Sequence, residues 1–474
     1  MIKLTSVVYY WAAWVVIPLV VEVLPNILSS LALAWKKISL KFKERDMEFF
    51  QPAVTMIVPV YNSAGTLYRC IQSISESSYP IKNIEVLLVD NGSKDNSFKE
   101  FERAQVDFPN LKMWWMASAQ GKSKALNKAI FNSNGKYVIN IDSDGILHKE
   151  AITNMIRRFE KYPDIDCMTG VILTEPALID KTENFFLRQF QKLEFVEYAQ
   201  AFLAGRNLES QFHSVFTLSG AFSAFRKSIL LKTYLYNTNT ICEDAHLAFQ
   251  IKDILKKKVS LCHDALFMVD PIEGLNKFYT QRQRWQIGEL EVTNMFMKKK
   301  MRNPIWSYFT DHSMRVVIQD HTFSFPRMIW YFALFALGCK NYDFSNIIIA
   351  TLLIYLLYAF DALMYYCNIV SFLQPFKDIR NYYAKKIVYV LLLPVYNTLA
   401  FFIRFAGIIN SIQRQSSWKT KGFVEEANEM SSVVTNDGEI LPAIRRAVKS
   451  LLEEAKPEEE KKECCTNSTS INST

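Results

Sequence analysis

The chain has 474 residues, of which 50% are hydrophobic and 14% aromatic, so it is more apolar than a purely soluble protein and we expect membrane segments. Its 55 basic and 47 acidic residues give a formal charge of +8, and juxtamembrane lysines and arginines supply much of this excess, which disfavours nucleic-acid binding. Its eight cysteines include no C-x-x-C pair, which argues against a disulfide framework and against a zinc site.

The first predicted element is an uncleaved membrane anchor from Leu4 to Trp35. This stretch is long enough to span a bilayer and is interrupted mainly by Glu22 and by Pro25-Asn26. A cleaved signal peptide is the competing interpretation, but the stretch exceeds the apolar core of such a peptide and shows no small-residue cleavage site. Basic residues that follow the anchor place the next part of the chain in the cytoplasm: Lys36, Lys37, Lys41, Lys43 and Arg45.

Two short apolar runs alternate with helical stretches after the anchor. Val54 to Val60 and Ile84 to Val89 read as strands, and the helix Ala64 to Glu76 separates them. This order at short spacing predicts a parallel, doubly wound α/β sheet. Asp90 ends the second strand in the sequence D-N-G-S, where its carboxylate can accept hydrogen bonds from a base or ribose. The same four residues are also typical of a simple turn.

The next two strands each end in polar residues that suit a phosphate or a cation. After the strand Leu111 to Met116, Gly121 and Lys122 begin a helix, where free N–H groups and positive charge favour phosphate, although the sequence is not a Walker A motif. The strand Tyr137 to Ile141 ends in Asp142 and Asp144, which follow the pattern D-S-D-G. Carboxylates so placed suit Mg²⁺ or Mn²⁺ that carries a diphosphate; a polar turn is the alternative.

The rest of this region contains three further motifs. The sequence first predicts a helix at Lys149 to Tyr162, a strand at Asp166 to Leu173 and an amphipathic helix at Asn184 to Phe202. The S-G-A-F stretch around Gly220 then predicts a bend of small residues, where the ring of another molecule can approach the backbone closely. Glu243 and Asp244 open a helix from Ala245 to Leu255, either as a cap or with one carboxylate as a proton acceptor. Helical spacing places three residues of Q-R-Q-R-W on one side, as a phosphate-binding and sugar-stacking group: Gln281, Arg284 and Trp285.

These motifs, in this order, resemble those of family 2 glycosyltransferases with the GT-A fold. The resemblance is to the membrane-embedded, often processive branch that includes cellulose, chitin, hyaluronan and poly-N-acetylglucosamine synthases, and it covers residues 53 to 300 with the flanking membrane segments. D-x-D alone is weak evidence, but its combination with E-D and Q-x-x-R-W at these separations is specific. Asn91 departs from the second aspartate that many members have, which bears on donor preference more than on catalysis.

The resemblance implies a role for each site residue. Asp244 would be the catalytic base, and Asp142 and Asp144 would hold the nucleotide and a divalent metal, Mg²⁺ or Mn²⁺. Asp90 would contact the uracil or ribose, and Lys122 would lie near the diphosphate. The remaining residues would bind the diphosphate or the acceptor sugar: Gly220, Glu243, Gln281, Arg284 and Trp285.

Apolar stretches near Phe325 to Cys339, Ile347 to Phe372 and Ile387 to Ile409 follow an interfacial segment at Asn303 to Thr322. With the enzyme domain in the cytoplasm, three full spans would put the tail outside, whereas the basic residues of the tail favour the inside. One of the three stretches is therefore expected to be an interfacial or re-entrant segment, and Pro394 makes the last stretch a candidate. The expected organisation is an anchor at 1–45, a cytoplasmic GT-A (Rossmann-like) domain at 46–300, interfacial and transmembrane helices at 301–412 and a mobile tail at 413–474.

The expected protein is therefore a multi-pass cell-membrane enzyme that transfers a sugar from a nucleotide-sugar, with a UDP-sugar as the expected donor, to a growing polysaccharide. The attack from the face opposite the leaving diphosphate would invert the anomeric centre. The alternatives are transfer of one sugar to a polyprenyl phosphate or other lipid acceptor, and a non-catalytic scaffold for envelope assembly. Export or accessory subunits are further candidate partners.

Overall fold

The computed structural model describes residues 16, 19–43, 49–211, 215, 217–301, 303, 306, 325–340 and 344–413. Three predicted features lie mainly outside the described residues: the start of the anchor, the interfacial segment at 303–322 and the tail from residue 414 on.

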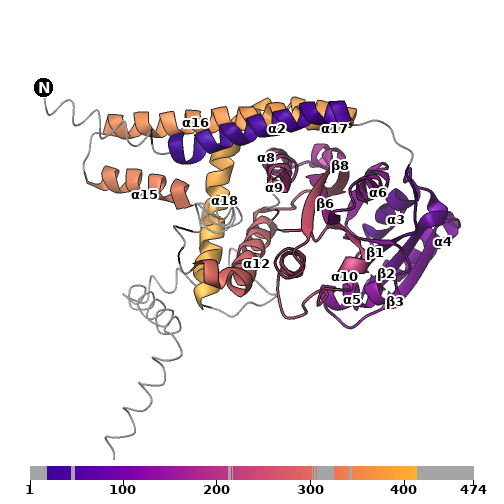
Figure 1. Ribbon diagram of the computed structural model, residues 1–474. Helices are drawn as coiled ribbons and strands as arrows, with labels where there is room; N and C mark the ends of the chain where they lie inside the picture. The colour runs from indigo at the N-terminus through magenta and orange to yellow at the C-terminus, as the bar shows by residue number, and fades with distance from the viewer. Residues whose placement is uncertain are drawn as a thin grey trace, which may run out of the picture.

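An eight-stranded mixed sheet forms the centre of the region between residues 49 and 301 (Figure 1). The parallel order predicted for the first strands is found in β3, β2, β1 and β4. The prediction of a parallel sheet is wrong for β7, which is antiparallel to both β4 and β6, and for β5, which is antiparallel to β8, whereas β6 and β8 are parallel. The spatial order is β3 (Lys112–Ala117), β2 (Ile84–Asp90), β1 (Val54–Val60), β4 (Tyr137–Ile141), β7 (Phe222–Arg226), β6 (Ile165–Thr174), β8 (Lys258–Val269) and β5 (Gly145–Leu147).

Helices cover both faces of the sheet, because alternate residues of its central strands point into opposite cores. In β1, Met56 and Val58 belong to the larger core, whereas Ile57 belongs to the smaller one on the opposite face. The larger core is packed by α3 (Leu67–Ser75), α4 (Ser97–Asp107), α6 (Ala151–Lys161) and α8 (Phe185–Tyr198), and the smaller by α5 (Lys122–Asn132), α10 (Lys227–Leu230) and α11 (Glu243–Phe249).

Several predicted boundaries change in the structure. The helix expected at Asn184 to Phe202 is α8, which continues as a π-helical segment, Ala199–Gly205, into α9 (Arg206–Gln211). The helix expected from Ala245 begins at Glu243 and also ends in a π-helical segment, Gln250–Ile254. The remaining elements of this region are a 3₁₀ turn (Ile81–Asn83), α7 (Pro176–Lys181) and α12 (Leu275–Met301).

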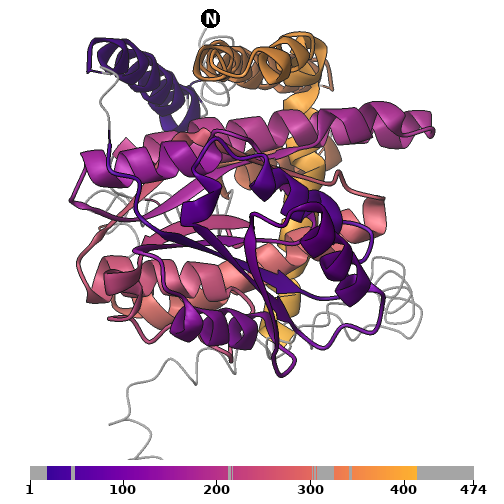
Figure 2. The same ribbon diagram turned by 90° about the vertical axis from the view of Figure 1, so that its right-hand side faces the viewer.

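Two helices near the carboxyl end of the described chain are long and apolar enough to cross a membrane, at Phe344–Phe372 and Ile387–Gly407. They belong to α16 (Phe344–Phe372) and α18 (Ile387–Gln413), and α17 (Lys377–Ala384) connects them. The first of the three predicted apolar stretches is α15 (Phe325–Cys339), whose 15 residues are fewer than the roughly 20 that a straight span needs. In Figure 1, α18 runs across the direction of α16 and not alongside it, and Figure 2 shows α18 upright beneath α16.

The predicted anchor is a π-helical turn (Leu19–Val23) and α2 (Leu24–Lys43), which packs beside α16 with its polar residues inward. The side-chain amide of Asn26 donates to Asp361 Oδ2 (2.7 Å), and that of Asn368 donates to the Ser30 carbonyl (3.0 Å). The outward face of this turn and of α2 is apolar and exposed at Val20, Leu24, Leu28, Leu31, Trp35 and Ile38. This polarity is the reverse of that of a water-soluble helix and suits a lipid environment.

Candidate functional site

One cavity of about 590 Å³ collects nine of the ten predicted site residues. They come from chain segments up to 163 residues apart in sequence, and the sheet brings them together because β4 and the turn before β7 end at the same edge. The predicted residues that line the cavity are Lys122, Asp142, Asp144, Gly220, Glu243, Asp244, Gln281, Arg284 and Trp285.

Lys122 and Asp142 form an ion pair at the floor of this cavity. Lys122 is the first residue of α5, directly after Gly121, and its Nζ donates to Asp142 Oδ1 (2.5 Å) and to the Gly220 carbonyl (3.3 Å). Although burial opposes the charged form, Asp142 and Glu243 raise the pKa of Lys122 above its ordinary value. A permanent positive charge therefore lies beside the first aspartate of D-S-D.

Asp144 is a buried acid that lies near a second carboxylate. Burial and the charge of Asp142 raise its pKa to about 6. Within the described residues, no group of three or more His, Cys, Asp or Glu side chains forms a metal site by itself. Two carboxylates at an oxygen-lined edge are nevertheless enough for Mg²⁺ or Mn²⁺, which takes its remaining ligands from water and from substrate phosphate.

Gly220 and Asp244 are in direct contact. The Gly220 N–H donates to Asp244 Oδ2 (2.8 Å), and the N–H of Ala245 donates to Asp244 Oδ1 (2.7 Å). A Cβ added to Gly220 would lie 3.0 Å from Asp244 Oδ2, so glycine is what permits this approach. The small-residue bend therefore orients a carboxylate that faces the cavity.

Glu243 is buried beside Asp244 at the start of α11. Burial raises the pKa of its carboxyl, with Asp244 contributing and Lys122 opposing. Capping and a functional role are thus compatible here, because the acidic residues of the first helical turn also line the cavity.

The Q-R-Q-R-W motif lies in α12, which packs closely on the E-D turn. A Cβ added to Gly288 would lie 2.6 Å from the Cβ of Cys242, so α12 approaches the E-D turn too closely for any side chain at position 288. The rings of Trp285 and Phe202 meet edge to face, with centroids 6.1 Å apart. Gln281, Arg284 and Trp285 all line the cavity, as the helical spacing predicts.

Two buried arginines of the cavity wall were not predicted from the sequence. Arg282 is only 2% exposed; its Nη2 pairs with Glu197 Oε2, and its guanidinium lies 4.6 Å from the centroid of Trp285. Arg206 is 9% exposed and lies over the ring of Phe202. The signal that could have revealed Arg206 is an isolated cation after the apolar run A-F-L-A-G.

Asp90 is the one predicted site residue that does not line the cavity. It ends β2, and its Oδ1 accepts a hydrogen bond from the Ser93 N–H (2.9 Å), as in a turn. Its neighbour Asn91 is linked to the site, because Asn91 Oδ1 accepts from the Gly121 N–H (2.5 Å) just before Lys122. The role of Asp90 in nucleotide binding stays a prediction.

Comparisons with known proteins agree with this geometry. The family described as Glycosyl transferase family 2 matches residues 55–233. The poly-beta-1,6-N-acetyl-D-glucosamine synthase of Staphylococcus epidermidis is 25% identical over 383 residues, which cover 78% of this chain and 85% of the relative. The synthase of the same name from Staphylococcus aureus (strain MSSA476) is 26% identical over 247 residues, which cover 50% of this chain and 55% of that relative.

Among solved structures, a mannosyltransferase from Pyrobaculum calidifontis in complex with GDP-Man and Mn²⁺ has a similar fold. It matches with a TM-score of 0.52 at 19% identity and covers 82% of this chain and 98% of that one. The family match at residues 55–233 includes the strand β4 and the D-x-D residues that follow it. The chain is therefore a glycosyltransferase that contains a family 2 catalytic domain of the GT-A fold.

Proposed function

We propose that this protein is a membrane-bound inverting glycosyltransferase that transfers an N-acetylglucosamine-type sugar from a nucleotide-diphospho-sugar, a UDP-sugar in the first instance, to a growing polysaccharide. The observation that supports this most is the single cavity that joins Lys122, Asp142 and Asp144 to Asp244 and to the Q-R-Q-R-W helix. The names of relatives, poly-beta-1,6-N-acetyl-D-glucosamine synthases, support the proposed sugar class.

The acceptor side of the cavity favours a long, neutral saccharide. The cavity continues from Trp285 to residues of the apolar helices, among them Asn26, Asp361, Asn397 and Arg404. These four side chains are two amides, one carboxylate and one guanidinium, so they offer hydrogen bonds to the hydroxyl groups of an uncharged saccharide and no excess of positive charge for the phosphate of a lipid acceptor. This charge balance favours polysaccharide over polyprenyl phosphate as the acceptor.

The residues divide into two groups in this mechanism. Lys122 and Arg284 stabilise the negative charge that develops on the departing diphosphate. Asp244, held by the Gly220 N–H, accepts the proton of the attacking acceptor hydroxyl, and attack opposite the diphosphate inverts the anomeric centre. A divalent cation held by Asp142 and Asp144 would add Lewis-acid stabilisation of the same leaving group.

The same proposal places the protein in a membrane as a multi-pass protein with the catalytic domain in the cytoplasm. The exposed apolar face of α2 and the apolar helix α16 support the membrane contact. Lys36 and Lys37 follow the apolar part of α2 on the side where the catalytic domain begins, which supports the orientation. Cysteine labelling from either side of sealed vesicles, with single cysteines in residues 46–300 and next to residue 16, tests the orientation.

The test of the function is nucleotide release together with product size. Purified enzyme in detergent is incubated with UDP-N-acetylglucosamine, UDP-glucose or GDP-mannose, each with Mg²⁺ or Mn²⁺, and the free nucleoside diphosphate and the glycan are measured. We expect release with a UDP-amino sugar and a product of many sugars. A single-sugar lipid product would support the polyprenyl phosphate alternative, and no release with any donor would support the scaffold.

A further inference from the structure

Arg206 differs from the other buried arginine of the cavity wall in having no acidic partner. Its Nη1 and Nη2 donate only to hydroxyl oxygens, of Thr169 (3.4 Å) and Thr217 (3.2 Å), and both distances are long for a charged donor. Arg282, by contrast, pairs with Glu197, whose carboxylate also accepts from Tyr396. Within the part of the chain that the structure describes, Arg206 forms no ion pair.

The electrostatic state of the two arginines follows from these partners. Burial lowers the pKa of Arg206, and the nearby carboxylates of Glu209, Asp244 and Glu289 offset this only in part. For Arg282 the ion pair with Glu197 outweighs the burial and raises the pKa. A buried guanidinium with spare donors is costly for folding, and such groups are concentrated where a ligand completes their hydrogen bonds.

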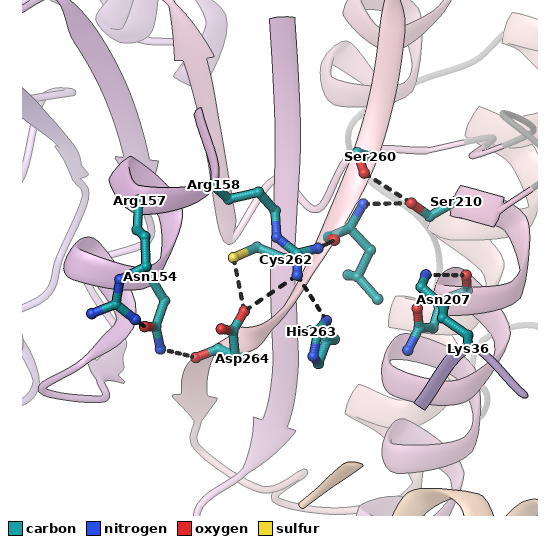
Figure 3. Close-up of polar contacts among 11 residues, drawn as sticks. Lys36, Asn154, Arg157, Arg158, Asn207, Ser210, Ser260, Cys262, His263 and Asp264 are labelled. Carbon is teal, nitrogen blue, oxygen red and sulfur yellow. Dashed lines mark hydrogen bonds and ion pairs between the residues drawn. The ribbon is translucent and has the colours of Figure 1, made fainter. Parts of the chain in front are cut away.

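Arg206 is the first residue of α9, and two other residues of this short helix, Asn207 and Ser210, are hydrogen-bonded to neighbouring elements (Figure 3). Lys36 of α2 donates to Asn207 Oδ1 (2.5 Å), directly after Arg206. Ser210 of α9 bonds to Ser260 of β8 (2.9 Å), and its Oγ accepts from the N–H of Leu261 (3.1 Å). The guanidinium is thereby presented to the cavity on a fixed helix, which reduces the entropy lost on binding.

The surroundings indicate the kind of ligand. The guanidinium lies 4.6 Å from the centroid of Phe202, and Phe202 meets Trp285, the residue expected to stack on the acceptor sugar. Asp244, the expected base, is among the carboxylates close enough to influence Arg206. Glu209 and Glu289 are the other carboxylates close enough to influence Arg206, and they disfavour an anion here and favour a neutral oxygen acceptor.

We propose that Arg206 is a specificity-determining residue of the acceptor subsite, where its guanidinium donates hydrogen bonds to a hydroxyl or carbonyl oxygen of the neutral sugar that lies on Phe202 and Trp285. This inference rests on the proposed transfer to a saccharide. It assigns Arg206 to acceptor binding and not to the diphosphate, which Lys122 and Arg284 contact.

The test separates acceptor binding from donor chemistry in the full-length protein. Wild type, Arg206→Gln and Arg206→Lys are compared for UDP release from UDP-N-acetylglucosamine without acceptor and for transfer to a soluble β-1,6-linked N-acetylglucosamine oligomer. Loss of a hydrogen bond to a charged group should raise the acceptor KM of Arg206→Gln about tenfold or more, with acceptor-free release within about twofold of wild type. Arg206→Lys keeps the charge, so its acceptor KM should lie between those of wild type and Arg206→Gln.

Arg226→Gln is the matched structural control. Arg226 is half-buried on β7, does not line the cavity, and donates to the carbonyls of Ile165 and Phe159. This variant should lower the thermal midpoint and leave the acceptor KM unchanged. The assignment of Arg206 would be overturned if the acceptor KM of Arg206→Gln were unchanged, or if its acceptor-free release fell as much as its transfer to the oligomer. Either outcome would leave the proposed polysaccharide transfer intact. A wild type that releases UDP but never extends the oligomer would overturn the proposed polysaccharide transfer, and the assignment of Arg206 with it.

Discussion

Two polar clusters of this protein contain similar buried side chains, but the pKa values of their buried acids are shifted in opposite directions. The junction cluster, Arg158 with Cys262, His263 and Asp264, lies where β8 meets α6 near α2 (Figure 3), whereas the acidic cluster around Asp144, Glu194 and Asp244 lines the cavity. In the junction cluster, Arg158 donates to the Leu261 carbonyl (2.7 Å) and contacts His263 Nδ1 (3.1 Å), and the Cys262 thiol donates to Asp264 (3.2 Å). The junction polar groups therefore have partners within the protein.

The pKa of Asp264 in the junction cluster and the pKa values of Asp144 and Glu194 in the cavity are shifted in opposite directions. Burial opposes ionisation of Asp264, but His263 and Arg158 lower its pKa below the ordinary value. In the cavity, burial raises the pKa of Asp144 to about 6 and of Glu194 to about 7. The difference teaches that the cations of the junction outweigh the burial of Asp264, whereas Lys122 and Arg282 only partly offset the burial of Asp144 and Glu194. Raised carboxyl pKa values therefore mark the side where a ligand or cation is expected.

The largest expected effect is on catalysis. Asp244→Asn should reduce sugar transfer by about 10²-fold or more, because the proton acceptor is lost while the hydrogen bond from Gly220 can persist. Donor binding, measured by isothermal titration with UDP, should remain. The junction variant Asp264→Asn is the control and should retain transfer; near-normal turnover by purified Asp244→Asn would refute its role as base.

Asp144→Asn should come next in size. Removal of one of two candidate metal ligands should lower nucleotide release by about 100-fold, corresponding to about 3 kcal/mol of lost charge stabilisation. Chelation of wild type should produce the same loss, and added Mn²⁺ or Mg²⁺ should restore wild type far better than the variant. Full activity of chelated wild type would contradict the metal prediction.

Arg282→Gln tests whether the paired arginine of the cavity wall is structural. It leaves the buried Glu197 carboxylate without its cation, which should cost about 3 kcal/mol of unfolding free energy, measured by denaturant titration in detergent. Arg206→Gln, which breaks no ion pair, should cost clearly less. The double variant Arg282→Gln/Glu197→Gln should recover part of the loss; equal destabilisation by both single arginine variants would remove the distinction between them.

The smallest expected effect is the dependence of folding stability on pH, which should have opposite signs for a residue of each cluster. Burial lowers the pKa of His263, so the unfolded chain binds a proton below about pH 6.5 that the folded protein does not, and wild type loses up to about 2 kcal/mol on acidification to pH 5. His263→Asn should remove this loss, so its thermal midpoint relative to wild type should be higher at pH 5 than at pH 7.5.

Glu194→Gln should show the reverse. The folded pKa of Glu194 is about 7, above its unfolded value, so wild type loses stability as pH rises from about 4.5 to 7. The thermal midpoint of Glu194→Gln relative to wild type should therefore be higher at pH 7.5 than at pH 5. If the thermal midpoint relative to wild type changed with pH in the same direction for His263→Asn and Glu194→Gln, the two clusters would not differ as described.

Local pattern was sufficient for the strands that carry the site. β1, β2 and β4 lie where the β-branched runs predict them, and Lys122 begins a helix as expected, because these features depend on neighbouring residues. Neither β7 nor β8 was predicted, because their pairing depends on strands far away in sequence. The same reason explains why Arg206 and Arg282 were missed: their burial comes from contacts between separate helices.

The sequence by itself determined the family resemblance, the order of the motifs and the apolar segments, since each is a property of residue type and spacing. Only the tertiary structure decided that nine predicted site residues share one cavity, that Asp90 does not line it, and that one buried arginine is neutralised while another is not. The physical reason is that the energy of a buried charge depends on what lies within a few ångströms of it, and those neighbours come from distant parts of the chain.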